Sequence, residues 1–144
     1  MFVLLEMTPI YFNFITVDTT TFLSNPKHIE IVIGMCRQML TTEPGESVEC
    51  YACKLLEVLI IHCHQSLDQF FPAILQVVLD RLTKPQKCPE VRIICEVVVM
   101  AALFCQTPIT LDILQQVHFP NSPEPITEQF FSKLLKEDFV QLTG

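Results

Sequence analysis

Apolar residues recur at intervals of three and four along most of this 144-residue sequence, and this spacing constrains the fold more than any other feature. It places apolar side chains on one face of an α-helix, whereas a half-buried strand would need strict alternation. Two segments that show it are 27–41 and 46–65. Their apolar positions are Ile29, Val32, Ile33, Cys36 and Leu40 in the first, and Val48, Ala52, Leu55, Leu56, Leu59 and Cys63 in the second. The sequence therefore predicts an all-α protein.

Polar and proline-containing breaks set the expected helix ends in the first half of the chain. Residues 1–14 are expected to be the tail of a helix that carries Pro9, followed by the polar connection "TVDTTTFLSNP". Asn25 and Pro26 have the residue types of an N-cap and of a first helical turn. We therefore expect the next helix to begin at about residue 27.

In the second half, "SLDQ" at residues 66–69 fits a capping box, in which a serine and a glutamine bond each other's free backbone N–H groups. It predicts a helix from there to about Lys84, with a kink near Pro72. Residues 89–105 are apolar almost all round, which predicts a helix covered on more than one side. Further helices are expected near 110–118 and 127–140.

The central helices form two successive pairs, 27–41 with 46–65 and 67–84 with 89–105. The pairs repeat at about forty residues, which is the length of HEAT-type helical repeats. The predicted fold is therefore a HEAT-like α-solenoid segment of stacked antiparallel helix pairs. It would span residues 1–144 as one unit, with pairs at approximately 27–65 and 67–105 and partial repeats at both ends.

Composition excludes several classes of function. With three glycines, neither Gly-rich phosphate-binding motif can be written in the sequence. The net charge is −7 and the basic residues are scattered, so direct nucleic-acid binding is not expected. No apolar run reaches the ~18 residues of a membrane-spanning helix, and the apolar start lacks the features of a signal peptide. Seven cysteines without a glycosylation acceptor indicate reduced thiols in the cytosol or nucleus.

The stretch "VECYACKLLEVLIIHCHQS" raises the hypotheses of a zinc site and of a redox pair. On a helix, however, His64 would lie roughly 16 Å further along the axis than Cys53, too far for one ion to bind both. A reactive C-x-x-C also usually follows a strand at a helix N-terminus, which is not the case here. We expect Cys50 and Cys53 to be packing thiols at the rim of the helix stack, on the side away from the core. No metal ligand, cofactor or catalytic residue is predicted, and enzyme activity has no support in the sequence.

Residues 71–101 resemble the HEAT consensus. Phe71 and Pro72, followed by the apolar residues of "AILQVVL", are similar to its first helix, and "PEVR" at 89–92 is similar to the start of its second. The acidic residue usual in the turn between them is missing from "TKPQKC".

Several motifs in order resemble the importin-7 and importin-8 group of nuclear transport receptors, in the importin-β superfamily. They are "NFITVDTTTFLS", "MCRQMLT", "VECYACKLLEV", "LDRLT" and "FPNSPEPIT". The resemblance implies part of the C-terminal half of a nuclear import receptor that binds cargo proteins for passage through the nuclear pore, in the cytoplasm and nucleus. It also implies that Ran-GTP binds through N-terminal parts absent from this sequence. A HEAT-repeat scaffold or adaptor outside nuclear transport remains the alternative.

The resemblance further implies that the second helix of each pair lines the surface that holds cargo. The polar residues expected on that surface are Glu46, Lys54, Glu57, Arg92 and Glu96, with Cys50 beside them. Because the chain is acidic, the expected partner is a basic protein cargo, attracted over a distance and weakened by salt. The apolar start, "MFVLLEMTPIYFNFI", in turn predicts that the isolated chain self-associates.

Overall fold

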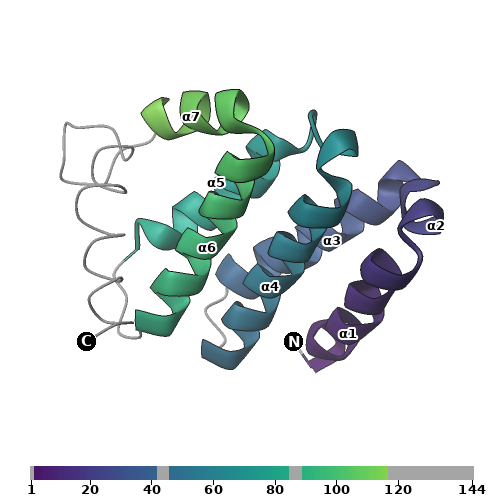
Figure 1. Ribbon diagram of the computed structural model, residues 1–144. Coiled ribbons are helices and arrows are strands. Elements are labelled where there is room, and N and C mark those ends of the chain that lie inside the picture. Colours follow the sequence, from purple (N-terminus) through teal and green to yellow (C-terminus); the bar gives the residue numbers. More distant parts are fainter. Residues whose placement is uncertain (1, 42–45, 85–88, 117–144) are drawn as a thin grey trace.

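The computed structural model describes residues 2–41, 46–84 and 89–116, and all regular elements within these ranges are helical (Figure 1). They are α1 (Phe2–Val17), α2 (Thr19–Leu23), α3 (Pro26–Thr41), α4 (Glu46–Cys63), the 3-10 turn η1 (His64–Ser66), α5 (Phe71–Leu82), α6 (Pro89–Cys105) and α7 (Thr107–Gln116). The prediction of an all-α fold is confirmed. The helix expected over 127–140 lies outside the described residues.

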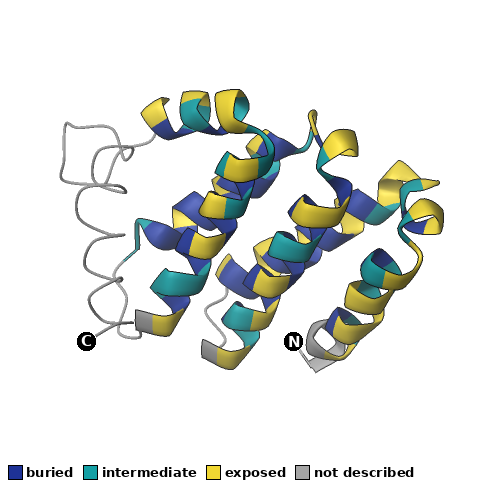
Figure 2. Cartoon of the chain, in the orientation of Figure 1, coloured by how far each residue is buried: buried dark blue, intermediate teal, exposed yellow. Residues whose placement is uncertain are grey.

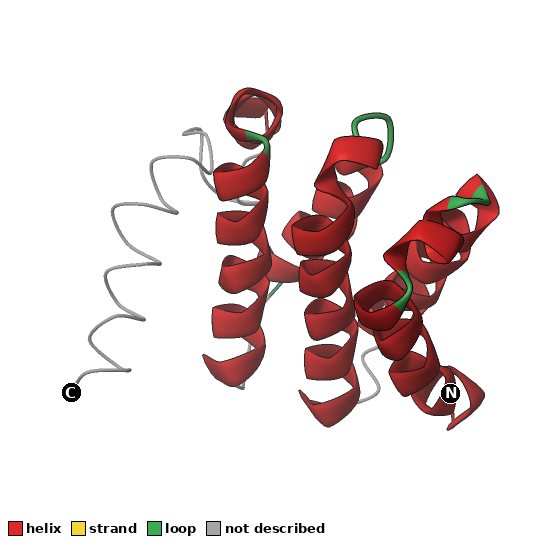
Figure 3. Ribbon diagram, turned by 45° about the vertical axis from the view of Figure 1, so that its right-hand side comes forward, coloured by secondary structure: helices red, strands yellow, loops and turns green. Residues whose placement is uncertain are grey.

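The helices are stacked in two layers. In one layer α4 lies between α1 and α6, and in the other α3 packs beside α5 (Figures 1 and 3). Each helix of the second layer also contacts its successor in the chain, α3 with α4 and α5 with α6. The short helix α7 runs across the ends of α5 and α6 and contacts both. This is the arrangement of an α-solenoid built from stacked helix pairs.

The core is one continuous cluster of buried apolar residues between the two layers (Figure 2). The five apolar positions predicted for α3 are all buried, and of the six predicted for α4 only Val48 remains half-buried. Helix α6 is covered by α4, α5 and α7, as its nearly all-round apolar sequence requires. Its residues Val98 and Val99 have no exposed surface.

The helix predicted from residue 66 begins five residues later, so the capping-box prediction was wrong. His64–Ser66 form the 3-10 turn η1, and α5 begins at Phe71 with Pro72 in its first turn. Proline is tolerated there because the N–H it lacks would have no helical partner. It therefore starts the helix and does not kink it. Leu67 and Phe71, both fully buried, anchor this connection to the core.

The segment predicted as a polar connection contains the short helix α2. Asp18 caps it, accepting a hydrogen bond from the Thr21 N–H at 3.4 Å. Phe22 is fully buried and packs edge-on against Phe14 with ring centroids 5.4 Å apart. One buried aromatic residue thus fixes a segment whose run of threonines suggested a loop.

The predicted start of α3 is confirmed. Asn25 accepts a hydrogen bond from the Lys27 N–H through its side-chain oxygen at 3.0 Å, and Pro26 is the first helical residue. Across the described ranges, no helix has both the length and the apolar character needed to cross a bilayer.

Candidate functional site

The polar residues predicted to face cargo lie on α4 and α6, neighbours in the layer that also contains α1. Lys54 is exposed, and Glu57 and Arg92 are half-buried. The side chain of Glu46 lies outside the described part of the chain. Cys50, one turn before Lys54 on the same side of α4, is also half-buried. Three of the five predicted residues are therefore reachable from solvent.

Glu96 does not belong to this surface, because its exposed fraction is only 2%. The sequence suggested a solvated position, since Glu96 interrupts an otherwise apolar helix. The interruption faces the interior of the stack, where α6 is enclosed by α4, α5 and α7. A dissolved partner therefore cannot reach Glu96 in this conformation.

A hollow of about 290 Å³ lies between α1 and α4, next to Lys54. The residues that line it are Thr8, Pro9, Phe12 and Asn13 from α1 and Tyr51 and Lys54 from α4. A second hollow, of about 230 Å³, is lined by Ser47, Cys50, Tyr51 and Lys54. Tyr51 and Lys54 are thus shared by both hollows. Together the two hollows form a concave surface between α1 and α4.

Two aromatic residues of this surface were missed in the sequence. Tyr51 is 49% exposed and Phe12 is 39% exposed, although both are large and mainly apolar. The position of Tyr51 in the sequence could have predicted its exposure, because it lies outside the apolar stripe of α4 and three residues before Lys54. Residues at that spacing lie on the same side of a helix. Phe12 offered no such signal, because α1 is apolar on several sides.

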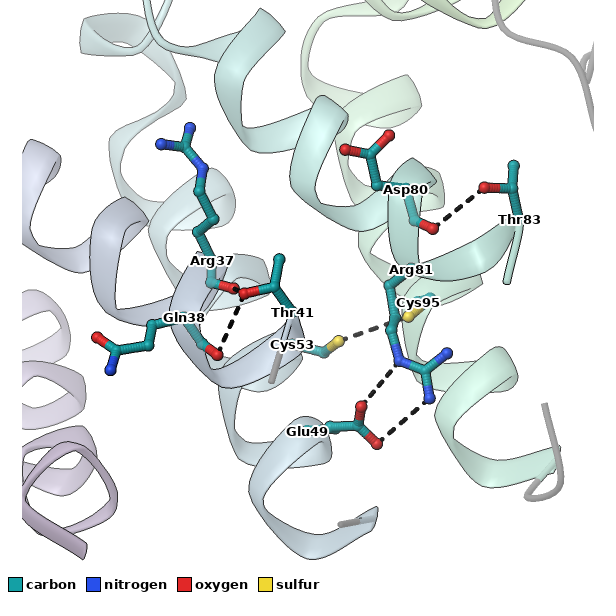
Figure 4. A network of polar contacts seen from close by, with 9 residues as sticks. All are labelled: Arg37, Gln38, Thr41, Glu49, Cys53, Asp80, Arg81, Thr83 and Cys95. Carbon is teal, nitrogen blue, oxygen red and sulfur yellow. Dashed lines mark hydrogen bonds and ion pairs between the residues drawn. The ribbon is translucent and has the colours of Figure 1, made fainter. Parts of the chain in front are cut away.

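The C-x-x-C stretch does not form the rim pair that was predicted. Cys53 is fully buried, and its sulfur lies 3.7 Å from the sulfur of Cys95 on α6 (Figure 4). The error arose because α4 is covered by α1, α3 and α6, so its buried face is wider than the single stripe used to orient it. Cys50 alone keeps the half-buried position expected of both thiols.

The buried thiols are held in their neutral form. Hydrogen bonding to Cys95, followed by burial, raises the pKa of Cys53 well above its ordinary value. Burial alone raises the pKa of Cys36 strongly and that of Cys63 to about 11. The thiolate is the reactive form of cysteine, so these sulfurs are poor nucleophiles at neutral pH.

The histidines of the same stretch do not join the thiols. His62 is exposed at the end of α4, and His64 Nδ1 lies 3.3 Å from the carbonyl oxygen of Ile61. Among the described residues, no group of three or more histidine, cysteine or acidic side chains is placed to hold a metal ion.

A buried ion pair between α4 and α5 was also missed. The guanidinium of Arg81 donates to Glu49 from Nε at 2.8 Å and from a terminal nitrogen at 3.4 Å (Figure 4). Both residues occupy positions of an apolar stripe, Glu49 before Ala52 and Arg81 after Val78. A charged residue at a position expected to be buried could have indicated an ion pair in the core. The pair joins the two layers between consecutive helix pairs.

Comparison with known proteins identifies relatives of nearly the whole chain. It is 44% identical to importin-8 of Mus musculus and 42% identical to importin-8 of Homo sapiens, each over 133 residues, or 92% of this chain. A probable importin-7 homolog of Dictyostelium discoideum is 26% identical over 129 residues. No protein-family model and no solved structure matches the sequence.

The chain spans only a small part of these relatives, 13% of the length of each importin-8. The identity over that part agrees with the resemblance read from the motifs. The chain is thus an importin-8-like protein sequence, homologous over 92% of its length to one segment of the importin-8 proteins.

Proposed function

We propose that this chain is a cargo-binding segment of a nuclear import receptor, acting as a binding protein and not as an enzyme. The observation that supports this most directly is the 44% identity to importin-8 over 92% of the chain. The stacked helix layers add support, because a solenoid presents an extended surface on which a protein partner can lie. As a receptor of this kind it would work in the cytoplasm and the nucleus.

The proposed contact surface is the solvent face of α1, α4 and α6 around the two hollows. Lys54, Glu57 and Arg92 are its described polar members, and Tyr51 and Phe12 supply exposed aromatic area. Exposed aromatic side chains beside charged ones are typical of protein-binding surfaces. Cargo would pack on the aromatic residues and be oriented by the charges around them.

The proposed cargo is a basic protein. The net charge of −7 attracts such a partner over a distance, and salt screens that attraction. A chain this small covers only part of a cargo, so its affinity would be weak. Direct binding to nucleic acid or to a membrane is not part of the proposal.

The test is a titration of the chain with a core histone at low and at moderate salt. We expect saturable binding at low salt that weakens as salt is added. Binding that is absent at low salt, or insensitive to salt, would contradict the electrostatic part of the proposal.

Two variants locate the contact. Glu57→Gln removes one negative charge from the proposed surface, and Asp112→Asn removes one from the exposed face of α7. Because both change the net charge equally, a general electrostatic effect would weaken binding equally in both. We expect Glu57→Gln to weaken binding several-fold more than Asp112→Asn.

Adding Ran-GTP distinguishes a nuclear import receptor from a scaffold protein outside nuclear transport. In the receptors that this chain resembles, Ran binds through N-terminal parts, so Ran-GTP is expected to leave cargo bound to this chain. The same cargo on a longer protein that contains this sequence should be released by Ran-GTP. Retention of cargo by the longer protein would favour a scaffold or adaptor outside nuclear transport.

A further inference from the structure

Two cysteine thiols from neighbouring helix pairs meet in the core. The sulfur of Cys53, on α4, lies 3.7 Å from the sulfur of Cys95, on α6, and neither residue has exposed surface (Figure 4). The two residues are 42 positions apart in the sequence. They meet because α4 and α6 lie side by side in the same layer.

We propose that Cys53 and Cys95 are an oxidation site that forms a disulfide between α4 and α6 when the protein meets hydrogen peroxide. The sulfur atoms must approach by about 1.7 Å to reach the bond length of a disulfide. A small shift of α4 against α6, with side-chain rotation, supplies a movement of this size. Among the cysteine pairs of the described ranges, this is the pair whose sulfur–sulfur contact the structure records.

The reaction balances with peroxide as the oxidant. One thiol sulfur takes an oxygen atom from hydrogen peroxide, giving a sulfenic acid and one water molecule. The second sulfur then attacks the first and displaces its hydroxyl group, which leaves as a second water with the proton of the attacking thiol. The thiols lose two electrons in all, and the peroxide is reduced.

Burial determines the rate of this reaction. The thiolate is the reactive form, and the raised pKa of Cys53 keeps its thiol neutral. Peroxide therefore reacts when α4 and α6 separate transiently, and more slowly than with the half-buried thiols of Cys50 and Cys105. Once formed, the disulfide would be shielded from bulky reductants by the same burial.

The consequence is a covalent link between two consecutive helix pairs. The disulfide would join α4 of the pair α3–α4 to α6 of the pair α5–α6. Bending of the stack would require the distance between α4 and α6 to change, and the disulfide would prevent this. Oxidation would thus stiffen this part of the solenoid. It would also restrict the unfolded chain, which raises resistance to denaturant.

The experiment is peroxide treatment of the folded 144-residue chain, followed by trypsin digestion and mass spectrometry without reduction. Tryptic peptides 38–54 and 93–133 carry Cys53 and Cys95, but each also carries a second cysteine, Cys50 or Cys105. The chain is therefore used with Cys50→Ser and Cys105→Ser. We expect these two peptides to appear linked, lighter than their sum by two hydrogen atoms, with a higher urea midpoint that dithiothreitol reverses.

Two variants in the same background serve as controls. Cys95→Ala should abolish the linked peptide, whereas Cys63→Ala, which removes another buried thiol of α4, should leave it. A linked species formed only in urea would overturn the proposal, as would Cys53 paired with a different cysteine. If Cys95→Ala does not fold, the peptide map of the background chain decides the question without it.

Discussion

Arg81 on α5 and Glu49 on α4 form an ion pair inside the helix stack, with Nε and Oε1 2.8 Å apart. Their side chains are only 8% and 5% exposed. The contact is two-pronged, since a terminal nitrogen of Arg81 lies 3.4 Å from Oε2 of Glu49. Because one residue comes from each layer, the pair fixes how the layers of consecutive repeats sit against each other. This arrangement leads to the first prediction.

Replacing Glu49 by Ala should destabilise the chain by about 3–5 kcal/mol, because it leaves the buried guanidinium of Arg81 without its carboxylate. The measurement is urea denaturation followed by circular dichroism. Glu49→Leu with Arg81→Met should cost much less than the sum of the single variants, since neither charge then remains buried. Asp80→Asn, at an exposed neighbour of Arg81, should change stability by less than about 0.5 kcal/mol. A single variant as mild as this control would contradict the prediction.

Val98→Asp should unfold the chain, whereas Val97→Asp should leave it folded. Val98 has no exposed surface and Val97 is 37% exposed, so the two adjacent positions of α6 differ mainly in burial. An unpaired carboxylate at a buried site costs several kcal/mol, roughly the stability of a whole domain. Thermal melting of the two proteins side by side is the measurement. Equal loss of stability in both would mean that α6 is not oriented as described.

The apolar spacing of the sequence predicted the helices and most of their buried faces, because burial of α3 and α4 follows the 3.6-residue period. The prediction failed where contacts between residues distant in the sequence determine a helix end or the burial of a side chain. The start of α5 depends on the buried anchors Leu67 and Phe71, which prevail over the local capping motif. Glu96 looks solvated along the chain, yet α4, α5 and α7 enclose α6 around it.

The candidate surface was predictable only in part, for the same reason. Lys54 was found because it lies opposite the apolar stripe of α4. The hollow beside it was not, because it also needs Pro9 and Phe12 of α1, about forty residues earlier. The apolar spacing of the two segments does not reveal that α1 packs against α4.

Cys53→Ser should lower the stability of the chain more than the same replacement at the half-buried Cys50. Cys53 is fully buried in contact with Cys95. A serine hydroxyl at this position would lose its hydration and would have only the weakly polar Cys95 thiol as a neighbour. We expect a loss of about 1–3 kcal/mol. Cys50→Ser, at a half-buried position one turn earlier, should cost less than about 1 kcal/mol. Urea unfolding under reducing conditions compares the two, and equal costs would contradict the burial difference.

The isolated chain is expected to self-associate through the exposed apolar stripe of α6. Phe104 is 89% exposed, Met100 42% and Val97 37%. Their spacing of three and four residues places them on one face of the helix, so they form a continuous apolar strip. Water-exposed strips of this kind promote association between copies.

Sedimentation velocity at increasing micromolar concentration is the measurement, with a rising average mass as the expected result. Phe104→Glu should shift the chain toward the monomer by adding a charge to the strip. Gln116→Glu adds the same charge at an exposed position of α7 and should leave the association unchanged. Loss of association in both variants would point to net charge as the cause, and a monomeric parent chain at every concentration would show that the strip does not bind a second copy.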